Sequence, residues 1–163
     1  MNNAHLHMVV NHFPIIGTIL AIGILIAGLL SKNNGVKITS YFVFIISAIF
    51  GLMSMATGDG AEELVKDMPN IGWKIIHEHE EIAEKLALLL DVIGVLSVVA
   101  LYFNFKKNPK EKIVSLIILG IAIASLVVIQ KVGTSGGEIR HTEIREGSQN
   151  TSAEKLDTNH DEK

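Results

Sequence analysis

Four long apolar runs constrain the fold of this chain more than any other feature of its sequence. Each run holds about the 18 to 25 residues that a helix needs to cross the hydrocarbon core of a bilayer. The runs are continuous and lack the alternation of apolar and polar residues typical of a membrane barrel, so we expect helices. The sequence predicts an all-α, four-helix transmembrane bundle. The predicted spans are residues 13–30, 38–56, 82–105 and 113–132.

The composition excludes several classes of site. The 163 residues include no cysteine, which removes disulfides, cysteine-ligated zinc, iron–sulfur clusters and covalently attached c-type haem. The formal charge is only −3, and no basic stripe with interleaved aromatics is present, so no nucleic-acid partner is expected. We expect one membrane domain over residues 1–146 and a polar, disordered tail over 147–163.

Lysines predict the orientation in the membrane. The stretch SKNNGVK after the first span carries Lys32 and Lys37, and NFKKNPKEK after the third span carries four lysines beside Glu111. The long connection between the second and third spans is acidic. Short lysine-rich connections stay in the cytoplasm. Both termini and the long connection are therefore expected on the outer, periplasmic side of the inner membrane of a Gram-negative-type bacterium.

Local signals predict where some helices begin and end. Asn11 is expected to cap the first span, with Pro14 in its first turn. Asp59 is expected to cap a short separate helix, DGAEELVKDM, with Glu62 at its third position as in a capping box. The stretch GTSGGE at 133–138 is expected to end the fourth span with turns.

Histidines collect at the predicted outer end of the bundle. Six of the seven lie there, together with most of the carboxylates, whereas random placement would have divided them between the two ends. Only His160, in the polar tail, is remote. The six are His5, His7, His12, His77, His79 and His141.

The third span adds a face of polar residues. His77, Glu81 and Glu84 lie on one side of a helix. Asp91 continues that side about 10 Å deeper, at 1.5 Å per residue. A carboxylate at that depth should face the bundle interior, pair with a donor or be protonated. Asp91 is therefore predicted as a buried carboxylate, either structural or active in proton relay or site tuning.

Three segments together suggest a family. HMVVNHFPI at 7–15, HEHEE at the head of the third span and GGEIRH at 136–141 resemble motifs of a family of poorly characterised four-span bacterial membrane proteins. That family starts with a His-Pro-x2-Val-His-Phe-Pro pattern, and the resemblance covers residues 5–145. By the resemblance, His7 and His12 match the first two motif histidines, and His77 or His79 matches the third. Met8 and Asn11 depart from the family pattern.

The resemblance also implies a functional setting. Relatives are similar in appearing beside, or fused to, redox domains such as Rieske and cytochrome c modules. A membrane electron-transfer role is thus implied, with a subunit of a complex favoured over a stand-alone enzyme. The lipid bilayer is the first expected partner, followed by a periplasmic redox protein or quinol. An oligomer or a larger membrane complex is compatible with this role.

The first hypothesis is a b-type haem protein. Non-covalent haem in a helical bundle needs axial imidazoles from facing helices and donors for its propionates. His12 and His79 are the leading candidates, and Arg140 is a candidate propionate partner. The further candidate ligands are His7, His77 and His141.

Two alternatives remain open. A non-haem site for iron, zinc, copper or manganese would use histidines and carboxylates on helices. In a structural subunit of a membrane complex, the polar end would merely face water. The candidate metal ligands are His12, His77, His79, His141, Glu62, Glu80, Glu81 and Glu84.

Overall fold

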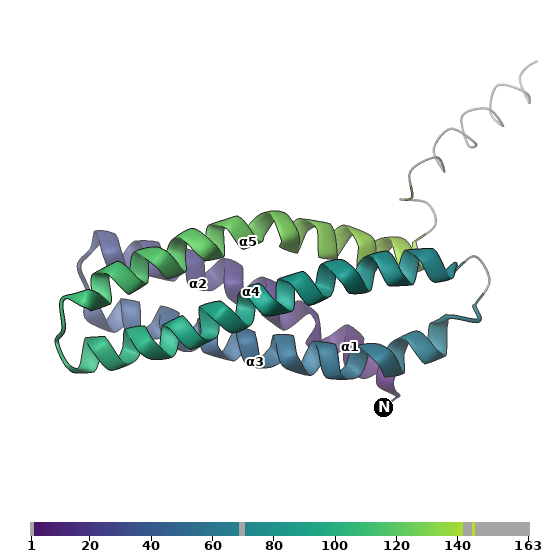
Figure 1. Ribbon diagram of the computed structural model, residues 1–163, viewed down its shortest axis with the longest axis horizontal. Coiled ribbons are helices and arrows are strands. Elements are labelled where there is room, and N and C mark those ends of the chain that lie inside the picture. Colours follow the sequence, from purple (N-terminus) through teal and green to yellow (C-terminus); the bar gives the residue numbers. More distant parts are fainter. Residues whose placement is uncertain (1, 69–70, 142–144, 146–163) are drawn as a thin grey trace, which may run out of the picture.

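Five helices make up most of the described chain. The computed structural model describes residues 2–68, 71–141 and 145, so the predicted tail at 147–163 lies outside the described residues. Within those ranges no strand occurs, and the predicted all-α four-helix bundle is confirmed. The helices, labelled in Figure 1, are α1 (Asn3–Val10), α2 (His12–Leu30), α3 (Asn34–Val65), α4 (Trp73–Phe105) and α5 (Lys110–Arg140).

The four long helices form a ring. α2 packs on α3, α3 on α4, α4 on α5 and α5 on α2, so that α3 and α5 face each other across the diagonal. The short helix α1 packs on α3. Figure 1 shows α1, the end of α3, the start of α4 and the end of α5 meeting at one end, which we call the histidine end. The opposite end carries the two short connections, residues 31–33 and 106–109, and is called the lysine end.

The outer surface of the bundle is apolar. Four helical segments, the first of them formed by α1 and α2 together, are long and apolar enough to cross a membrane. Large apolar side chains such as Leu20, Leu88 and Val127 are 57%, 66% and 61% exposed. Such a surface is costly in water but compatible with the acyl chains of a lipid bilayer. The fold is that of a multi-pass membrane protein.

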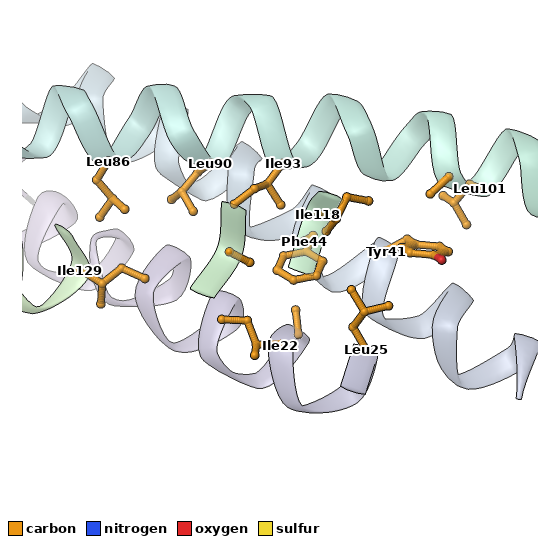
Figure 2. Packing of buried hydrophobic residues seen from close by; sticks show 13 residues of the cluster. Ile22, Leu25, Tyr41, Phe44, Leu86, Leu90, Ile93, Leu101, Ile118 and Ile129 are labelled. Atoms are coloured by element: carbon orange, nitrogen blue, oxygen red, sulfur yellow. The ribbon is translucent and has the colours of Figure 1, made fainter. Parts of the chain in front are cut away.

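Large side chains fill the middle of the bundle. Figure 2 shows Tyr41 and Phe44 of α3 beside Leu25 of α2, Ile93 of α4 and Ile118 of α5. Each of these five side chains is at most 1% exposed. Because lipid tails are as apolar as leucine, association in a bilayer depends on close contact between such side chains rather than on removal from water.

The first membrane segment is broken at Asn11, between α1 and α2. Pro14 cannot donate a backbone hydrogen bond to Val10, and its ring crowds that carbonyl, so a straight helix is disfavoured. Asn11 occupies the N-cap position of α2 but makes no side-chain capping bond, so the predicted cap is wrong. The break has a consequence for the site, because it separates the helix that carries His7 from the helix that carries His12.

α3 runs without interruption through Gly58, Asp59 and Gly60, so the predicted short helix capped by Asp59 is wrong. Packing of α1 outweighs the local turn signals here. A Cβ added at Gly60 would lie 2.8 Å from Asn3 Cγ, and one at Gly58 would lie 3.9 Å from His7 Cε1. The glycines therefore allow α1 to approach α3 and do not end the helix.

α5 likewise continues through residues 133–138 as far as Arg140, so the turns predicted there are wrong. Gly136 lies against the ring of His79, and a Cβ at this position would be 3.1 Å from His79 Cε1. The small residues of this stretch let the backbone of α5 approach α4, and that contact favours continuation of the helix.

Two turns of the same design join the helices at the lysine end. Lys32 and Lys107 both have left-handed backbones, with φ of 51° and 52°. In each turn the next residue donates its N–H to the carbonyl five positions earlier, at 3.0 Å and 2.9 Å, which closes the preceding helix. Glycine is usual at this position, because the left-handed backbone costs any other L-residue about 1 kcal/mol. In this protein lysine occupies the position in both turns.

Candidate functional site

The ring of His7 is fixed between α1 and α3. His7 is partly buried, and its Nδ1 lies 3.1 Å from the carbonyl oxygen of Ser54 and 3.2 Å from Thr57 Oγ1. A carbonyl can only accept, so Nδ1 carries the proton and donates it to Ser54. The lone pair of the neutral ring is therefore on Nε2, which has no partner among the described residues.

The ring of His79 is fixed in the same way between α4 and α5. His79 is partly buried, and its Nδ1 lies 2.9 Å from Ser135 Oγ. The Ser135 hydroxyl also lies 3.3 Å from the Val132 carbonyl, and when it donates its proton there it accepts from Nδ1–H of the imidazole. In that tautomer Nε2 of His79 carries the lone pair, and it has no partner in the described part of the chain.

His7 and His79 form a pair of donors at the histidine end. The two rings are near enough that a positive charge on one disfavours a positive charge on the other, although they come from helices far apart in the sequence. A histidine that ligates a metal almost always donates its other ring N–H to a carbonyl, carboxylate or similar group, which fixes the tautomer and the ring orientation. His7 satisfies that requirement through Ser54, and His79 satisfies it when Nδ1 donates to Ser135; Gly58 and Gly136 lie beside the two rings.

The other N-terminal histidines are exposed. His12 Nδ1 lies 2.7 Å from the carbonyl oxygen of Met8, so this ring also presents Nε2, but at the surface. His5 is exposed on α1. Beside them, Asn11 Oδ1 is buried and without a hydrogen-bond partner among the described residues. A buried acceptor of this kind fits a site that receives a further polar group.

His77 belongs to an exposed face of α4. Its ring stacks on Trp73, with centroids 4.8 Å apart, and its nitrogens lie 3.9 Å from Glu80 and 3.4 Å from Glu81. Glu84 is also exposed on this helix. These side chains follow the predicted helical face, but that face points outward rather than into the bundle.

Two carboxyls meet between α3 and α4. Glu80 of α4 lies beside Glu62 of α3, and Asp59 adds a further negative charge nearby. Carboxylates held together repel each other, so this arrangement favours a proton on one of them. The pair links the end of α3 to the start of α4.

The remaining candidates are placed at other positions. Asp91 is partly buried on α4, and no donor among the described residues reaches its carboxyl. His141 is exposed directly after α5, and its backbone N–H bonds to the Gly137 carbonyl at 2.9 Å. Arg140 is the last residue of α5, and its side chain lies outside the described part.

The candidate metal ligands do not gather into one cluster. Over residues 2–68, 71–141 and 145, no group of three or more His, Asp or Glu side chains is arranged to hold a metal ion. What the described residues bring together is the pair of neutral imidazoles, His7 and His79. Haem needs only one or two axial imidazoles from the protein, whereas a non-haem ion needs a fuller shell.

A second polar cluster, at the lysine end, is absent from the sequence-based expectations. Lys37 Nζ lies 2.8 Å from Glu111 Oε2, and the two side chains are only 11% and 9% exposed. Tyr41 donates its hydroxyl to Glu111 Oε1, and Ser115 Oγ lies 3.2 Å from the same oxygen. The ion pair joins α3 to α5 across the diagonal of the ring.

A sequence signal for this cluster exists. Lys37 and Tyr41 are four residues apart, as are Glu111 and Ser115, and each pair begins near the start of its helix. The two helices start at the same end of the bundle, so the pairs meet at the same depth. The sequence alone places Lys37 and Glu111 in polar connections, whereas the structure buries both.

The fold and the site define a class: a four-span membrane bundle with a pair of neutral, partly buried imidazoles at one end and a buried ion pair at the other. Comparisons with models of known protein families, with curated proteins and with solved structures found no match for this chain. The function is therefore argued from the site itself.

Proposed function

We propose that this chain is an integral membrane electron-transfer protein that binds a b-type haem at its histidine end. The observation that carries the proposal is the state of His7 and His79. Both rings are partly buried, both have Nδ1 in a hydrogen bond, and neither Nε2 has a partner among the described residues. They come from different helices, and a positive charge on one ring disfavours a positive charge on the other.

The residues at this end fit such a group. His7 and His79 would supply neutral nitrogen donors, which haem iron accepts from proteins. Ser54, Thr57 and Ser135 hold the two rings in orientation. A bound haem would supply one-electron redox chemistry to the protein.

His12 remains a prediction as a ligand, because its Nε2 is also unengaged but lies at the surface. His77, His141 and Arg140 stay candidates of lower rank. His77 and His141 are exposed, and Arg140 is the last residue of α5.

We further propose that the histidine end faces the periplasm, in a bacterial inner membrane. The lysine-rich connections at the opposite end support this orientation. Electron exchange would then take place with a periplasmic redox protein or with quinol, and the chain would act as a carrier or as a subunit of a larger membrane complex. The resemblance to the four-span family with Rieske and cytochrome c neighbours supports the same setting.

The test is an absorption spectrum of the detergent-purified protein, as isolated and after dithionite, with elemental analysis of the same sample. We expect a Soret band that sharpens and shifts on reduction, with iron close to the haem content. Stoichiometric zinc, copper, manganese or non-haem iron without a Soret band would replace the proposal by the His/carboxylate alternative. If the protein contains neither haem nor metal after expression with added haem precursor, the structural-subunit alternative replaces the proposal.

A further inference from the structure

All exposed charges at the lysine end are positive. The sequence has one acidic residue within residues 26–41 and 98–116, namely Glu111, and its carboxylate is buried against Lys37. That ion pair is neutral as a whole, so no carboxylate is left beside the exposed ammonium groups. The exposed side chains are Lys32, Lys106, Lys107, Lys110 and Lys112.

Lysines at the histidine end are arranged differently. Three of the four exposed lysines there have a carboxylate within 4 Å on their own helix or turn, and the fourth, Lys131, makes no ion pair among the described residues. The pairs are Lys66 with Glu63 at 2.8 Å, Lys74 with Glu78 at 3.6 Å and Lys85 with Glu81 at 3.8 Å. Lysines without an ion pair are therefore concentrated at the lysine end, with five there against one in the histidine-end half.

The lysines at the lysine end lie at the boundary of the apolar surface. Leu30 is 80% exposed and Phe105 is 68% exposed, and each stands two residues before a left-handed lysine. Tyr102, 59% exposed, adds an aromatic ring at the same level. In a membrane protein this sequence of apolar, aromatic and basic side chains marks the depth of the lipid headgroups.

The choice of lysine at the two turns points to a role for the charge. Lys32 and Lys107 occupy left-handed positions at which glycine is the more stable residue. Neither side chain makes a hydrogen bond or ion pair among the described residues. The conformation thus disfavours lysine at both positions, and no contact within the described chain compensates for it.

We infer that the lysine end is a binding surface for anionic phospholipid headgroups. Five unpaired ammonium groups at headgroup depth complement lipid phosphates, and a group of four to eight basic residues next to a transmembrane helix is typical of such recognition. Each lysine near an anionic surface strengthens binding about fivefold. The buried Lys37–Glu111 pair contributes by keeping the only acidic residue of this end away from the headgroups.

The experiment compares the parent chain with the double variant Lys32→Gly/Lys107→Gly in zwitterionic detergent. Thermal unfolding is followed while phosphatidylglycerol or phosphatidylcholine is titrated into the micelles. We expect two opposite effects in the variant: a higher melting temperature without lipid, because glycine suits both turns, and an apparent affinity for phosphatidylglycerol about 30-fold weaker. High salt should remove the phosphatidylglycerol effect in the parent.

The matched control is Lys66→Gln/Lys74→Gln, which removes the same charge at the histidine end and should leave the phosphatidylglycerol affinity unchanged. Equal affinities in the parent and the glycine variant would overturn the inference. An equal loss in the glutamine control would do the same, because net charge would then explain the effect. Inorganic phosphate is tested at a concentration that supplies the same negative charge as the phosphatidylglycerol. Equal stabilisation of the parent by inorganic phosphate would also overturn the inference, since a free anion would then replace the lipid.

Discussion

Replacing His79 by alanine is expected to lower the haem content of the purified protein at least about tenfold. His79 is the partly buried ring whose Nδ1 is held by Ser135, so the substitution removes a fixed nitrogen donor from the histidine end. Changes to a group that merely orients a metal ligand already cost about 10- to 100-fold in affinity, and loss of the ligand itself costs more. The measurement is haem per chain, from the spectrum of the reduced pyridine complex.

His77→Ala is the matched control for this prediction. His77 lies on the same helix, two residues away, but is exposed and stacked on Trp73. Haem content should stay near that of the parent in this variant, while Ser135→Ala should show an intermediate loss. Circular dichroism and size-exclusion profiles identify any variant that is misfolded. Equal haem loss in the His77 and His79 variants would argue against the assignment of His79.

Replacing Glu111 by leucine is expected to destabilise the bundle by about 3 kcal/mol, because an isolated buried charge remains. Lys37 would keep its ammonium group in the interior without the carboxylate at 2.8 Å. Its stem has little room to move toward α2, since Gly28 approaches so closely that a Cβ there would lie 2.8 Å from Lys37 Cγ. The measurement is the free energy of unfolding in mixed micelles, from titration with a denaturing detergent.

The double variant Lys37→Met/Glu111→Leu separates the charge from the packing. Replacing both members of a buried ion pair by apolar side chains of similar size is often neutral or stabilising. We expect the second substitution to recover most of the stability lost in the single variant. If the double variant is no more stable than Glu111→Leu alone, the buried lysine charge is not the cause of the loss.

The class of fold could be predicted from the sequence because partition into a membrane is a local property of an apolar run. The points at which helices end were less predictable. Asp59 and the stretch 133–138 carry turn signals, yet both lie inside helices. The reason is tertiary: α1 lies on α3 beside Gly60, and the ring of His79 lies on Gly136. Contacts between segments distant in the chain outweighed local propensity.

The site could be predicted in part. The clustering of histidines at one end follows from helix lengths alone, and the observed helix bounds place six of them there. The roles of individual rings depend on their partners. His7 is held by residues 47 and 50 positions later in the chain, and His79 by a serine 56 positions later. Sequence spacing favours His12 over His7, and only the break at Asn11 shows which ring is turned toward α3.

The buried cluster at the lysine end shows the same limit. Lys37 and Glu111 have the composition of connecting segments, so each alone indicates solvent exposure. Their pairing depends on two helices of the same direction meeting across the diagonal of the bundle, which requires the arrangement of all four helices. A polar pair buried in this way is specified by tertiary register rather than by local sequence.

The central claim is that two neutral imidazoles at the histidine end bind one haem, and electron paramagnetic resonance of the oxidised, purified protein tests it most directly. Two axial imidazoles produce low-spin ferric haem, whereas a single imidazole leaves it high-spin. The account predicts a low-spin signal in the parent that turns high-spin, or disappears with the haem, in His7→Ala. A high-spin signal in the parent, or a low-spin signal unchanged in His7→Ala, would contradict the claim.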